Sequence, residues 1–382
     1  MKRPLREQSS SALDRVRVLT TATDGFGGHC GIALYTRNLL TAVSSHPAHP
    51  DVVALPRVMP LAPEARPENL EWDVSGLGGR ARYAGAVLRA ALRRGPFDLV
   101  VCAHLHLLPL AYPIARAYGA PLALFIYGIE VKQPTAHLLT NHLASRVDAI
   151  VSIRRHTTRA LESWARAKDA RTFLLENAID LSRYGMAPKD PELVARFGLS
   201  GKRVIATVSR MGETYIGIDE VIAALGRVAR EVPDVVYFVG GDGPDLPRLR
   251  AKAEALGVAD RVVFAGFVPD ERKADYYRLA DAYAMPGTGP DFDRYPLRFA
   301  FLEAMACGIP VVGATPEDPD EAAVDGALLA RQIDPGDTDA VARALVEALA
   351  LPKAIPPGLA RFGYESFERR AHAIVDDLLA GH

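Results

Sequence analysis

The sequence has little of three things: net charge, cysteine and long apolar segments. Its 382 residues carry a formal net charge of −1, so no basic excess points to nucleic acid as a partner. The three cysteines, Cys30, Cys102 and Cys307, stand far apart in the sequence and lack the spacing of a zinc-binding motif. Such sparse cysteine fits a reducing compartment such as the cytoplasm. The longest uncharged run, 99–115, contains two histidines and two prolines, which favours a strand followed by a helix over a membrane span.

The chain length suits two domains of roughly 150–200 residues each. Residues 1–13 carry charge without an apolar core, so we expect a disordered tail rather than a signal peptide. The arginine-rich runs 80–82 and 93–94 favour solvated helix faces, with a basic contact to the inner face of an anionic membrane as the open alternative. These features predict a cytoplasmic, globular protein.

Apolar segments of strand length alternate with amphipathic helical segments through both halves. The expected strands are 16–21, 52–55, 99–103, 122–126, 149–152 and 173–175 in the first half, and 203–208, 235–239, 262–268, 282–285 and 311–313 in the second. This order predicts an α/β fold with two doubly wound, Rossmann-like domains facing a cleft. We place residues 14–180 in the N-terminal domain, 181–360 in the C-terminal domain and 361–382 in a last amphipathic helix.

A glycine-rich loop, 24–32, lies between the first strand and the first helix. Glycine lets the backbone approach a ligand and the helix N-terminus offers N–H groups, so an anion site is plausible here. Cys30 stands where a dinucleotide fingerprint needs its third glycine, which disfavours a nicotinamide cofactor. The other interpretation is a glycine-rich turn without chemistry.

Two histidines, His104 and His106, follow the expected strand 99–103. Their alternation allows both to face one ligand. The plainer interpretation is that two polar residues end a buried strand.

The most informative stretch is 292–312. Residues 302–306, Leu-Glu-Ala-Met-Ala, form helices readily, and Gly308 with Pro310 ends such a helix before a short strand at 311–313. Glu303 therefore lies early in a helix that opens at the carboxyl edge of a sheet, where open α/β sheets bind ligands. The free N–H groups of the first turn suit a phosphate.

This stretch resembles the Glu-x7-Glu region of retaining family-4 glycosyltransferases with the GT-B fold, because 302–312 matches Leu-Glu-Ala-Met-Ala-x-Gly-x-Pro-Val-Val. The resemblance implies that Glu303 holds the ribose hydroxyls of a nucleotide sugar. It implies further that the backbone of Leu297, Arg298 and Phe299 meets the diphosphate.

The first half of that region departs from the family. Tyr295 stands where the family has a glutamate that contacts the sugar, and Asp293 or Asp291 is a candidate for the missing carboxylate.

Other segments match the same family. Arg210 matches an arginine that clamps the diphosphate, but Ile216 replaces the family's second cation, and Arg298 or Arg294 can compensate. The turn at Gly241 matches the family's Gly-x-Gly-Pro turn.

The resemblance also implies that the backbone around Phe267 reads the nucleobase and that the Gly27-Gly28 loop lies near the donor phosphates. Tyr127 stands where the family has a histidine that contacts the donor sugar. The last helix, 361–382, packs back on the N-terminal domain in this family.

Three hypotheses follow. The first is a metal-independent retaining hexosyltransferase that uses no cofactor and moves a hexose from a UDP- or GDP-sugar to a hydroxyl acceptor. Its candidate catalytic residues are Arg210, Glu303 and Tyr127. The second is a catalytically impaired relative that binds a nucleotide, a glycan or a partner enzyme, as the departures at Tyr127, Ile216 and Tyr295 suggest. The third is another α/β enzyme, such as a dehydrogenase or epimerase.

Overall fold

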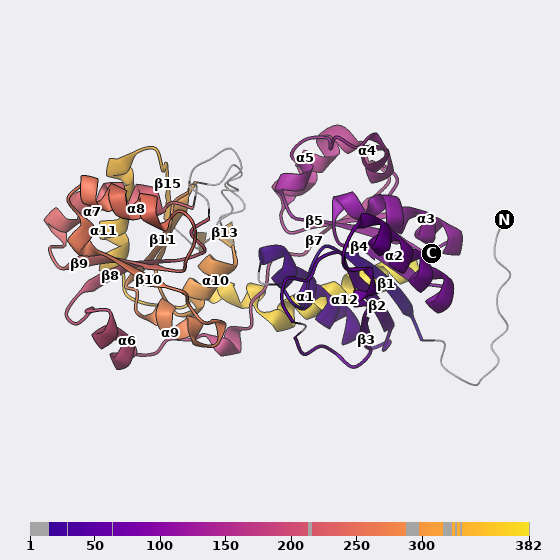
Figure 1. Cartoon of the computed structure of the whole chain (residues 1–382), viewed down its shortest axis with the longest axis horizontal. Coiled ribbons are helices and arrows are strands. Elements are labelled where there is room, and N and C mark those ends of the chain that lie inside the picture. The colour runs from indigo at the N-terminus through magenta and orange to yellow at the C-terminus, as the bar shows by residue number, and fades with distance from the viewer. Residues whose placement is uncertain are drawn as a thin grey trace. The chain divides into compact units, whose positions relative to one another are not determined.

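The computed structural model describes residues 15–28, 30–62, 64–212, 216–287, 298–315, 323–324, 327–328 and 331–381. The predicted tail at 1–13 and the candidates Asp291, Asp293, Arg294, Tyr295 and Leu297 lie outside these residues. The chain divides into two compact units (Figure 1). Unit 1 comprises Met1–Ser152, Thr157–Leu175 and Glu368–His382, and unit 2 comprises Ile153–His156 and Glu176–Phe367.

Unit 1 contains a seven-stranded parallel sheet in the order β3-β2-β1-β4-β5-β6-β7. Its strands are β1 (Arg17–Ala22), β2 (Asp51–Pro56), β3 (Leu70–Trp72), β4 (Leu99–Cys102), β5 (Leu122–Ile126), β6 (Ala149–Ser152) and β7 (Arg171–Leu174). The central strands are apolar and buried along their whole length, as expected when helices cover both faces of a parallel sheet.

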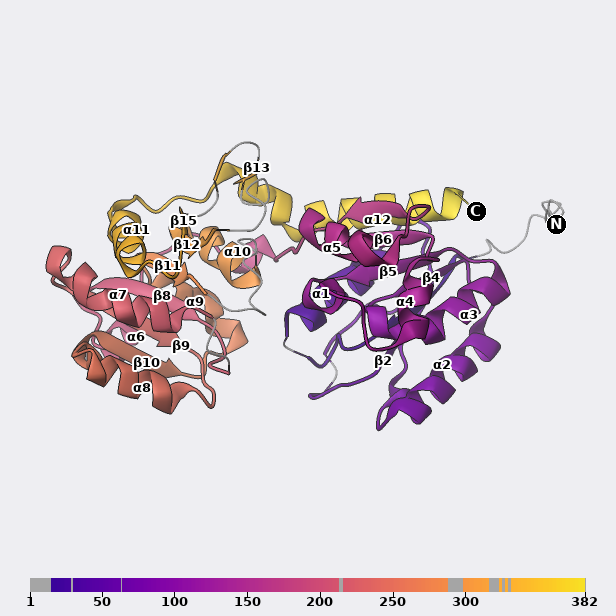
Figure 2. The ribbon, with the colours of Figure 1, turned by 90° about the horizontal axis from the view of Figure 1, so that it is seen from above.

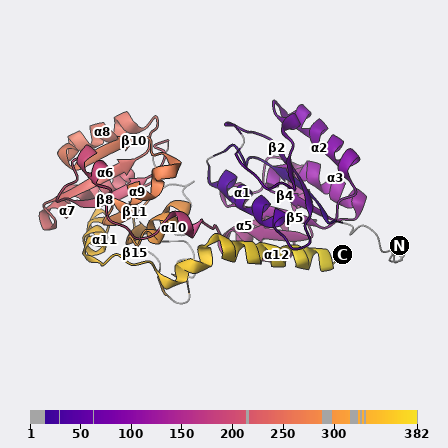
Figure 3. The ribbon, with the colours of Figure 1, turned by 90° about the horizontal axis from the view of Figure 1, so that it is seen from below.

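The helices of unit 1 are α1 (Gly31–Ser44), α2 (Arg80–Arg94), α3 (Leu108–Tyr118), α4 (Leu138–Ala144) and α5 (Arg155–Ala165). Tyr83 and Val87 of α2 and Ala111 of α3 pack in one core with Leu19 and Val53 of the sheet. Figure 3 shows α2 and α3 side by side.

The last helix, α12 (Tyr364–Ala380), begins in unit 2, and its residues from Glu368 on belong to unit 1. Figure 2 shows α12 in yellow, running along unit 1. Its His372 bonds the Ala42 carbonyl of α1 at 2.8 Å, and Arg171 of β7 donates to the Asp377 carbonyl at 2.8 Å. Polar contacts thus join α12 to both a helix and an edge strand of unit 1.

Unit 2 contains a six-stranded parallel sheet in the order β10-β9-β8-β11-β12-β15. Its strands are β8 (Arg203–Val208), β9 (Val235–Gly240), β10 (Val262–Gly266), β11 (Ala282–Met285), β12 (Val311–Ala314) and β15 (Arg331–Ile333). A separate antiparallel pair joins β13 (Ala323–Val324) to β14 (Ala327–Leu328). The two parallel sheets confirm the predicted pair of Rossmann-like α/β domains.

The helices of unit 2 are α6 (Pro191–Arg196), α7 (Ile218–Glu231), α8 (Leu246–Ala255), α9 (Lys273–Arg278), α10 (Phe299–Ala306) and α11 (Thr338–Ala350). Helix α10 ends as predicted, since Gly308 has φ +74° and its N–H donates to the Met305 carbonyl at 2.9 Å. Strand β12 then pairs with β11 in parallel.

Each sheet has one point at which the strand order reverses. In unit 1 this switch point lies between β1 and β4, and in unit 2 between β8 and β11. In doubly wound folds the loops after such strands diverge to opposite sides, and ligands bind in the crevice that they leave at the carboxyl edge of the sheet. Among the described helices, none is long and apolar enough to cross a bilayer.

Candidate functional site

The loop after β8 carries Arg210 to the switch point of unit 2. The Ser209 N–H donates to the Gly240 carbonyl at 2.9 Å, and the Met211 N–H donates to the Asp242 carbonyl at 2.9 Å. These bonds fasten the loop to the one after β9. The Arg210 side chain is exposed, and its guanidinium has no hydrogen-bond or ion-pair partner among the described residues. A charged group held in place by its backbone and left without a partner suits an anionic ligand.

The close packing of the loops after β8 and β9 requires glycine at position 241. It has φ +128°, and a Cβ atom there would lie 1.9 Å from the Ser209 carbonyl oxygen. Its N–H donates to the Gly266 carbonyl at 2.8 Å, which links the ends of β9 and β10. Gly241 thus shapes the loop that presents Arg210, while its predicted contact with a donor stays a prediction.

Glu303 lies in the second turn of α10 rather than at its start, where the sequence pattern predicted it. It is 5% exposed, and polar partners hold both its carboxylate oxygens. Lys273 Nζ donates to Oε1 at 2.8 Å, and the Tyr277 hydroxyl donates to Oε2 at 2.7 Å. Burial, together with the nearby Glu303 charge, raises the pKa of Tyr277 well above its usual value, so the phenol stays a donor. The carboxylate is therefore oriented and able to accept further hydrogen bonds on its remaining lone pairs.

Tyr184 is a third polar neighbour of this carboxylate. Burial raises the pKa of Tyr184, and the Glu303 charge raises it further. The Tyr184 and Tyr277 rings meet edge to face with centroids 6.4 Å apart. The sequence did not identify Lys273, Tyr277 or Tyr184. The spacing of Lys273 and Tyr277 puts them on one face of α9, but nothing local connects that face to Glu303.

The N-terminus of α10 lies at the same sheet edge. Arg298 is its N-cap residue, and its carbonyl accepts the Phe301 and Leu302 N–H groups, both at 3.0 Å. The N–H of Phe299 belongs to the first turn, which has no intrahelical acceptor and favours an anion.

The charge of Arg298 acts on the buried hydroxyl of Tyr283. Burial raises the pKa of Tyr283, and the Arg298 guanidinium works against that rise. The Tyr283 hydroxyl contacts both the N–H and the carbonyl of Val208 at 3.3 Å. Since Val208 ends β8, these bonds hold the Tyr283 hydroxyl at the strand end that precedes Arg210.

The other predicted positions of unit 2 have distinct settings. Ile216 is half-buried and packs on the apolar core of unit 2, so it serves packing where the family has a cation. The next residue, Gly217, has φ +105°, and a Cβ atom there would lie 2.6 Å from the Pro286 nitrogen. Phe267, directly after β10, is 76% exposed, which leaves its ring available to a flat ligand.

The glycine-rich loop of unit 1 folds tightly on itself. Gly27 has φ +117°, and a Cβ atom on Gly28 would lie 2.1 Å from the Asp24 carboxylate. The Gly28 N–H donates to the Gly25 carbonyl at 3.1 Å, and the Gly25 N–H donates to Asp24 Oδ1 at 2.7 Å. Packing alone therefore requires glycine here, and the donor-phosphate role of Gly27 and Gly28 stays a prediction.

Tyr127 points into unit 1. It is 8% exposed, and its hydroxyl donates to the Ala103 carbonyl at 3.1 Å. Its ring meets Tyr35 edge to face with centroids 5.3 Å apart. Burial raises the pKa of Tyr127, so the phenol stays protonated. These contacts favour a packing role over acid–base chemistry.

Two family models match the chain. Residues 30–183 match the model described as Glycosyltransferase Family 4, and residues 202–350 match Glycosyl transferases group 1.

Curated relatives cover part of the chain. A GDP-mannose-dependent alpha-(1-6)-phosphatidylinositol monomannoside mannosyltransferase of Mycolicibacterium smegmatis is 33% identical over 64% of this chain and 65% of its own length. A 2-deoxystreptamine N-acetyl-D-glucosaminyltransferase of Streptomyces fradiae is 31% identical over 48% of this chain and 44% of its own. The chain thus spans less than two thirds of these relatives' length.

Solved structures show the same fold at low identity. Anabaena Alr3699/HepE in complex with UDP is 18% identical with a TM-score of 0.71, covering 95% of this chain and 100% of its own. A sucrose-phosphate synthase from Thermosynechococcus elongatus is 18% identical with a TM-score of 0.73, covering 96% and 100%.

Proposed function

This chain belongs to the family-4 and group 1 glycosyltransferases, and on that premise we propose that it transfers a hexose from a UDP- or GDP-sugar to a hydroxyl acceptor with retention. The observation that supports the proposal is the strand order of unit 2. Arg210 follows β8, and α10 with the buried Glu303 follows β11, and these two strands flank the switch point. Cationic and N–H groups suit a diphosphate, and an oriented carboxylate suits the hydroxyls of a ribose.

In this proposal, groups of this chain stabilise the negative charge of the leaving diphosphate. Within the described part of the chain Arg210 has no side-chain partner, so its guanidinium can form charge-assisted bonds with the leaving oxygens. Arg298 and the first-turn amides of α10 supply the support that Ile216 does not. These groups are oriented before the reaction, so they stabilise the developing charge without reorganisation.

The nucleoside lies, in this proposal, between Glu303 and Phe267. Glu303 accepts hydrogen bonds from the ribose hydroxyls while Lys273 and Tyr277 keep its carboxylate oriented. The exposed Phe267 ring covers one face of the base. The nucleotide sugar is a substrate, and no cofactor is assigned.

A binding protein without transferase activity is the second candidate function. Two positions that are polar in the family serve packing in this chain, because Tyr127 bonds the Ala103 carbonyl and Ile216 lies on the core of unit 2. Such a protein would keep Arg210 and Glu303 for a nucleotide and would not turn over the sugar.

Thermal unfolding with nucleotides separates the two candidates. GDP-mannose is the first donor to test because one relative is named GDP-mannose-dependent, and GDP, UDP, dTDP and UDP-glucose complete the panel. A ligand at 100 times its Kd adds about 2.7 kcal/mol to the unfolding free energy, which raises Tm by several degrees. We expect one nucleotide sugar to stabilise more than its bare diphosphate and to release that diphosphate when a hydroxyl acceptor is present. Stabilisation by the bare nucleotide alone supports the binding protein, and no response to any nucleotide contradicts both.

We also infer that α2 contacts an anionic membrane surface. Leu88 and Leu92 are 57% and 74% exposed on its outer side, beside the exposed Arg89 and Arg93. We expect the double variant Leu88→Gln/Leu92→Gln to bind vesicles that contain an anionic lipid at least tenfold more weakly, as measured by co-sedimentation. The reason is that neither glutamine can bury an apolar side chain in the membrane surface. The matched control is Leu256→Gln, a 50% exposed leucine of unit 2, which should bind as the wild type does. Equal loss in both variants would contradict the role of α2.

A further inference from the structure

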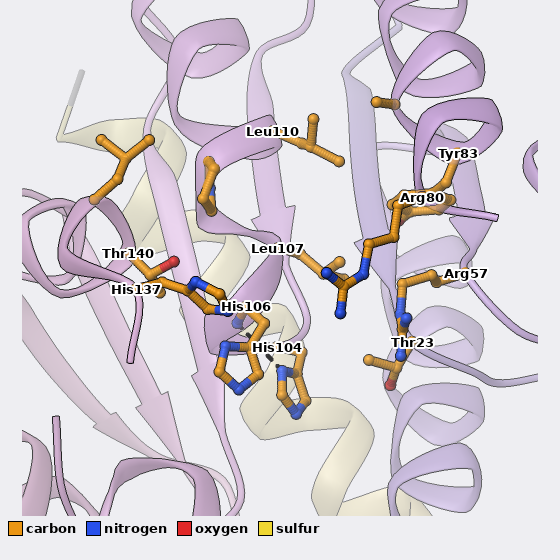
Figure 4. A pocket seen from close by; sticks show the side chains of 13 residues that line it. Thr23, Arg57, Arg80, Tyr83, His104, His106, Leu107, Leu110, His137 and Thr140 are labelled. Atoms are coloured by element: carbon orange, nitrogen blue, oxygen red, sulfur yellow. Dashed lines mark hydrogen bonds between the residues drawn. The ribbon is translucent and has the colours of Figure 1, made fainter. Parts of the chain in front are cut away.

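A cavity of about 510 Å³ opens at the carboxyl edge of the unit 1 sheet (Figure 4). Three of its lining residues follow strands: Thr23 directly after β1, Arg57 directly after β2, and His104 two residues after the end of β4. Arg80 at the start of α2 and His137 just before α4 line it from the flanks. Because β1 and β4 flank the switch point, this cavity occupies the ligand position of a doubly wound sheet.

Cationic and titratable side chains face this cavity without a carboxylate among them. Figure 4 shows the histidines on one side and Arg57 and Arg80 on the other. Neither arginine forms an ion pair within the described part of the chain. The Asp24 carboxylate lines the adjoining hollow with both arginines, but its Oδ1 accepts from the Gly25 N–H. The lining of the cavity itself therefore carries positive charge, and the carboxylate of Asp24 lies in the hollow beside it.

The three histidines form one row. The His104 and His106 rings stack with centroids 5.3 Å apart, and the His106 and His137 centroids are 6.1 Å apart. Burial, then His106 and Arg57, lower the pKa of His104 to about 4, and burial and its cationic neighbours also lower the pKa of His106. Neutral imidazoles are hydrogen-bond donors at pH 7.

The row of histidines is not arranged as a metal site. Among the described residues, no three His, Cys, Asp or Glu side chains are placed to hold a metal ion. The other lining residues include Leu107, Leu110 and Leu139, which suit the body of an organic ligand rather than a bare ion.

We propose that this cavity binds the phosphate group of a phosphorylated hydroxyl acceptor. Arg57 and Arg80 take the phosphate charge, and the imidazole N–H groups of the histidines bond its oxygens. The volume leaves room for a body of sugar size beside the phosphate. The inference that the bound phosphate ester is the acceptor rests on the proposed function. The anion site itself does not, because all its lining residues belong to unit 1.

Calorimetry on the full chain tests the anion site, with the nucleoside diphosphate that binds best held at saturation so that the donor site is filled. Glucose 6-phosphate is the probe, and glucose is its uncharged counterpart. We expect glucose 6-phosphate to bind at least tenfold more tightly than glucose. The variant Arg57→Ala/Arg80→Ala should lose about 10- to 100-fold of that affinity, because each arginine supplies a charge-assisted bond. The control Arg66→Ala removes an exposed arginine outside the cavity lining and should bind as the wild type does.

Two further measurements keep the outcomes separate. Phosphatidylcholine vesicles that carry equal charge as phosphatidylinositol or as phosphatidylserine distinguish a lipid headgroup from a free phosphate ester. Only a headgroup ligand makes a preference for phosphatidylinositol over phosphatidylserine depend on Arg57 and Arg80. Unchanged nucleotide binding by the double variant shows that the fold is intact. Equal affinity for glucose and glucose 6-phosphate, or wild-type affinity in the double variant, overturns the inference. Failure of every nucleotide to bind, with this arginine dependence retained, overturns the proposed function and leaves the anion site standing.

Discussion

The Arg210→Ala variant is expected to lose about 100- to 1,000-fold in kcat, measured as nucleoside diphosphate release with saturating donor and acceptor. The guanidinium faces outward from a loop that backbone bonds fasten to its neighbour, and it has no partner among the described residues. Removing one oriented donor from a developing oxyanion costs a factor of this size in other enzymes. The effect falls mainly on kcat, because the diphosphate gains negative charge as the glycosidic bond breaks.

Two further variants isolate this role. Arg210→Lys keeps the charge and loses the planar fork, so an intermediate loss of about tenfold is expected. Arg230→Ala removes an exposed arginine from the last turn of α7, at the opposite edge of the same sheet, and should leave kcat unchanged. A rise in donor KM with unaltered kcat in Arg210→Ala would show that the arginine binds ground state and transition state equally.

The Glu303→Gln variant is expected to weaken binding of the nucleotide sugar by about 10- to 100-fold. A neutral amide replaces a charged acceptor, and hydrogen bonds to charged groups contribute about 1.5–3 kcal/mol. The sharper measurement compares each ribonucleotide with its 2′-deoxy form. The wild type should prefer the ribonucleotide, and Glu303→Gln should lose most of that preference.

Tyr277→Phe is the matched control for Glu303. It removes one of the two bonds that orient the carboxylate but keeps the carboxylate itself. We expect a loss in affinity below tenfold and a retained preference for the ribonucleotide. Glu303→Ala should in addition destabilise the fold by about 1–3 kcal/mol, because the buried Tyr277 hydroxyl loses its acceptor. An unchanged ribose preference in Glu303→Gln would mean that Glu303 only anchors α9 to α10.

The pattern of apolar segments predicted most of the fold. The run 203–208 is β8 in full, and 122–126 is β5 in full, because strands buried on both faces must be apolar along their length. The pattern missed four short strands: β3, β13, β14 and β15. Two of them, Leu70–Trp72 and Arg331–Ile333, lie at the edges of the parallel sheets and contain charged or polar residues. Such a segment becomes a strand because it pairs with a neighbouring strand, and local periodicity does not report that partner.

Local chemistry also determined the end of α10. Gly308 adopts the left-handed conformation that a side chain disfavours, and Ala304 to Ile309 close the helix through backbone bonds. The position of Glu303 in the helix follows from the same residues. The hydrogen-bond partners of that carboxylate could not be predicted from the sequence, because Lys273 and Tyr277 belong to another helix, α9.

The sequence by itself determined two doubly wound domains, the place of Glu303 in a helix that opens at the carboxyl edge of a sheet, and the departures at Tyr127 and Ile216. The tertiary structure alone decided which side chains share a site. It turned Tyr127 inward to a backbone carbonyl, and it placed Arg80, which the sequence pattern assigned to a solvated helix face, beside Arg57 and His104. The physical reason is that periodicity reports which residues are apolar, whereas a site forms where loops distant in sequence converge at one sheet edge.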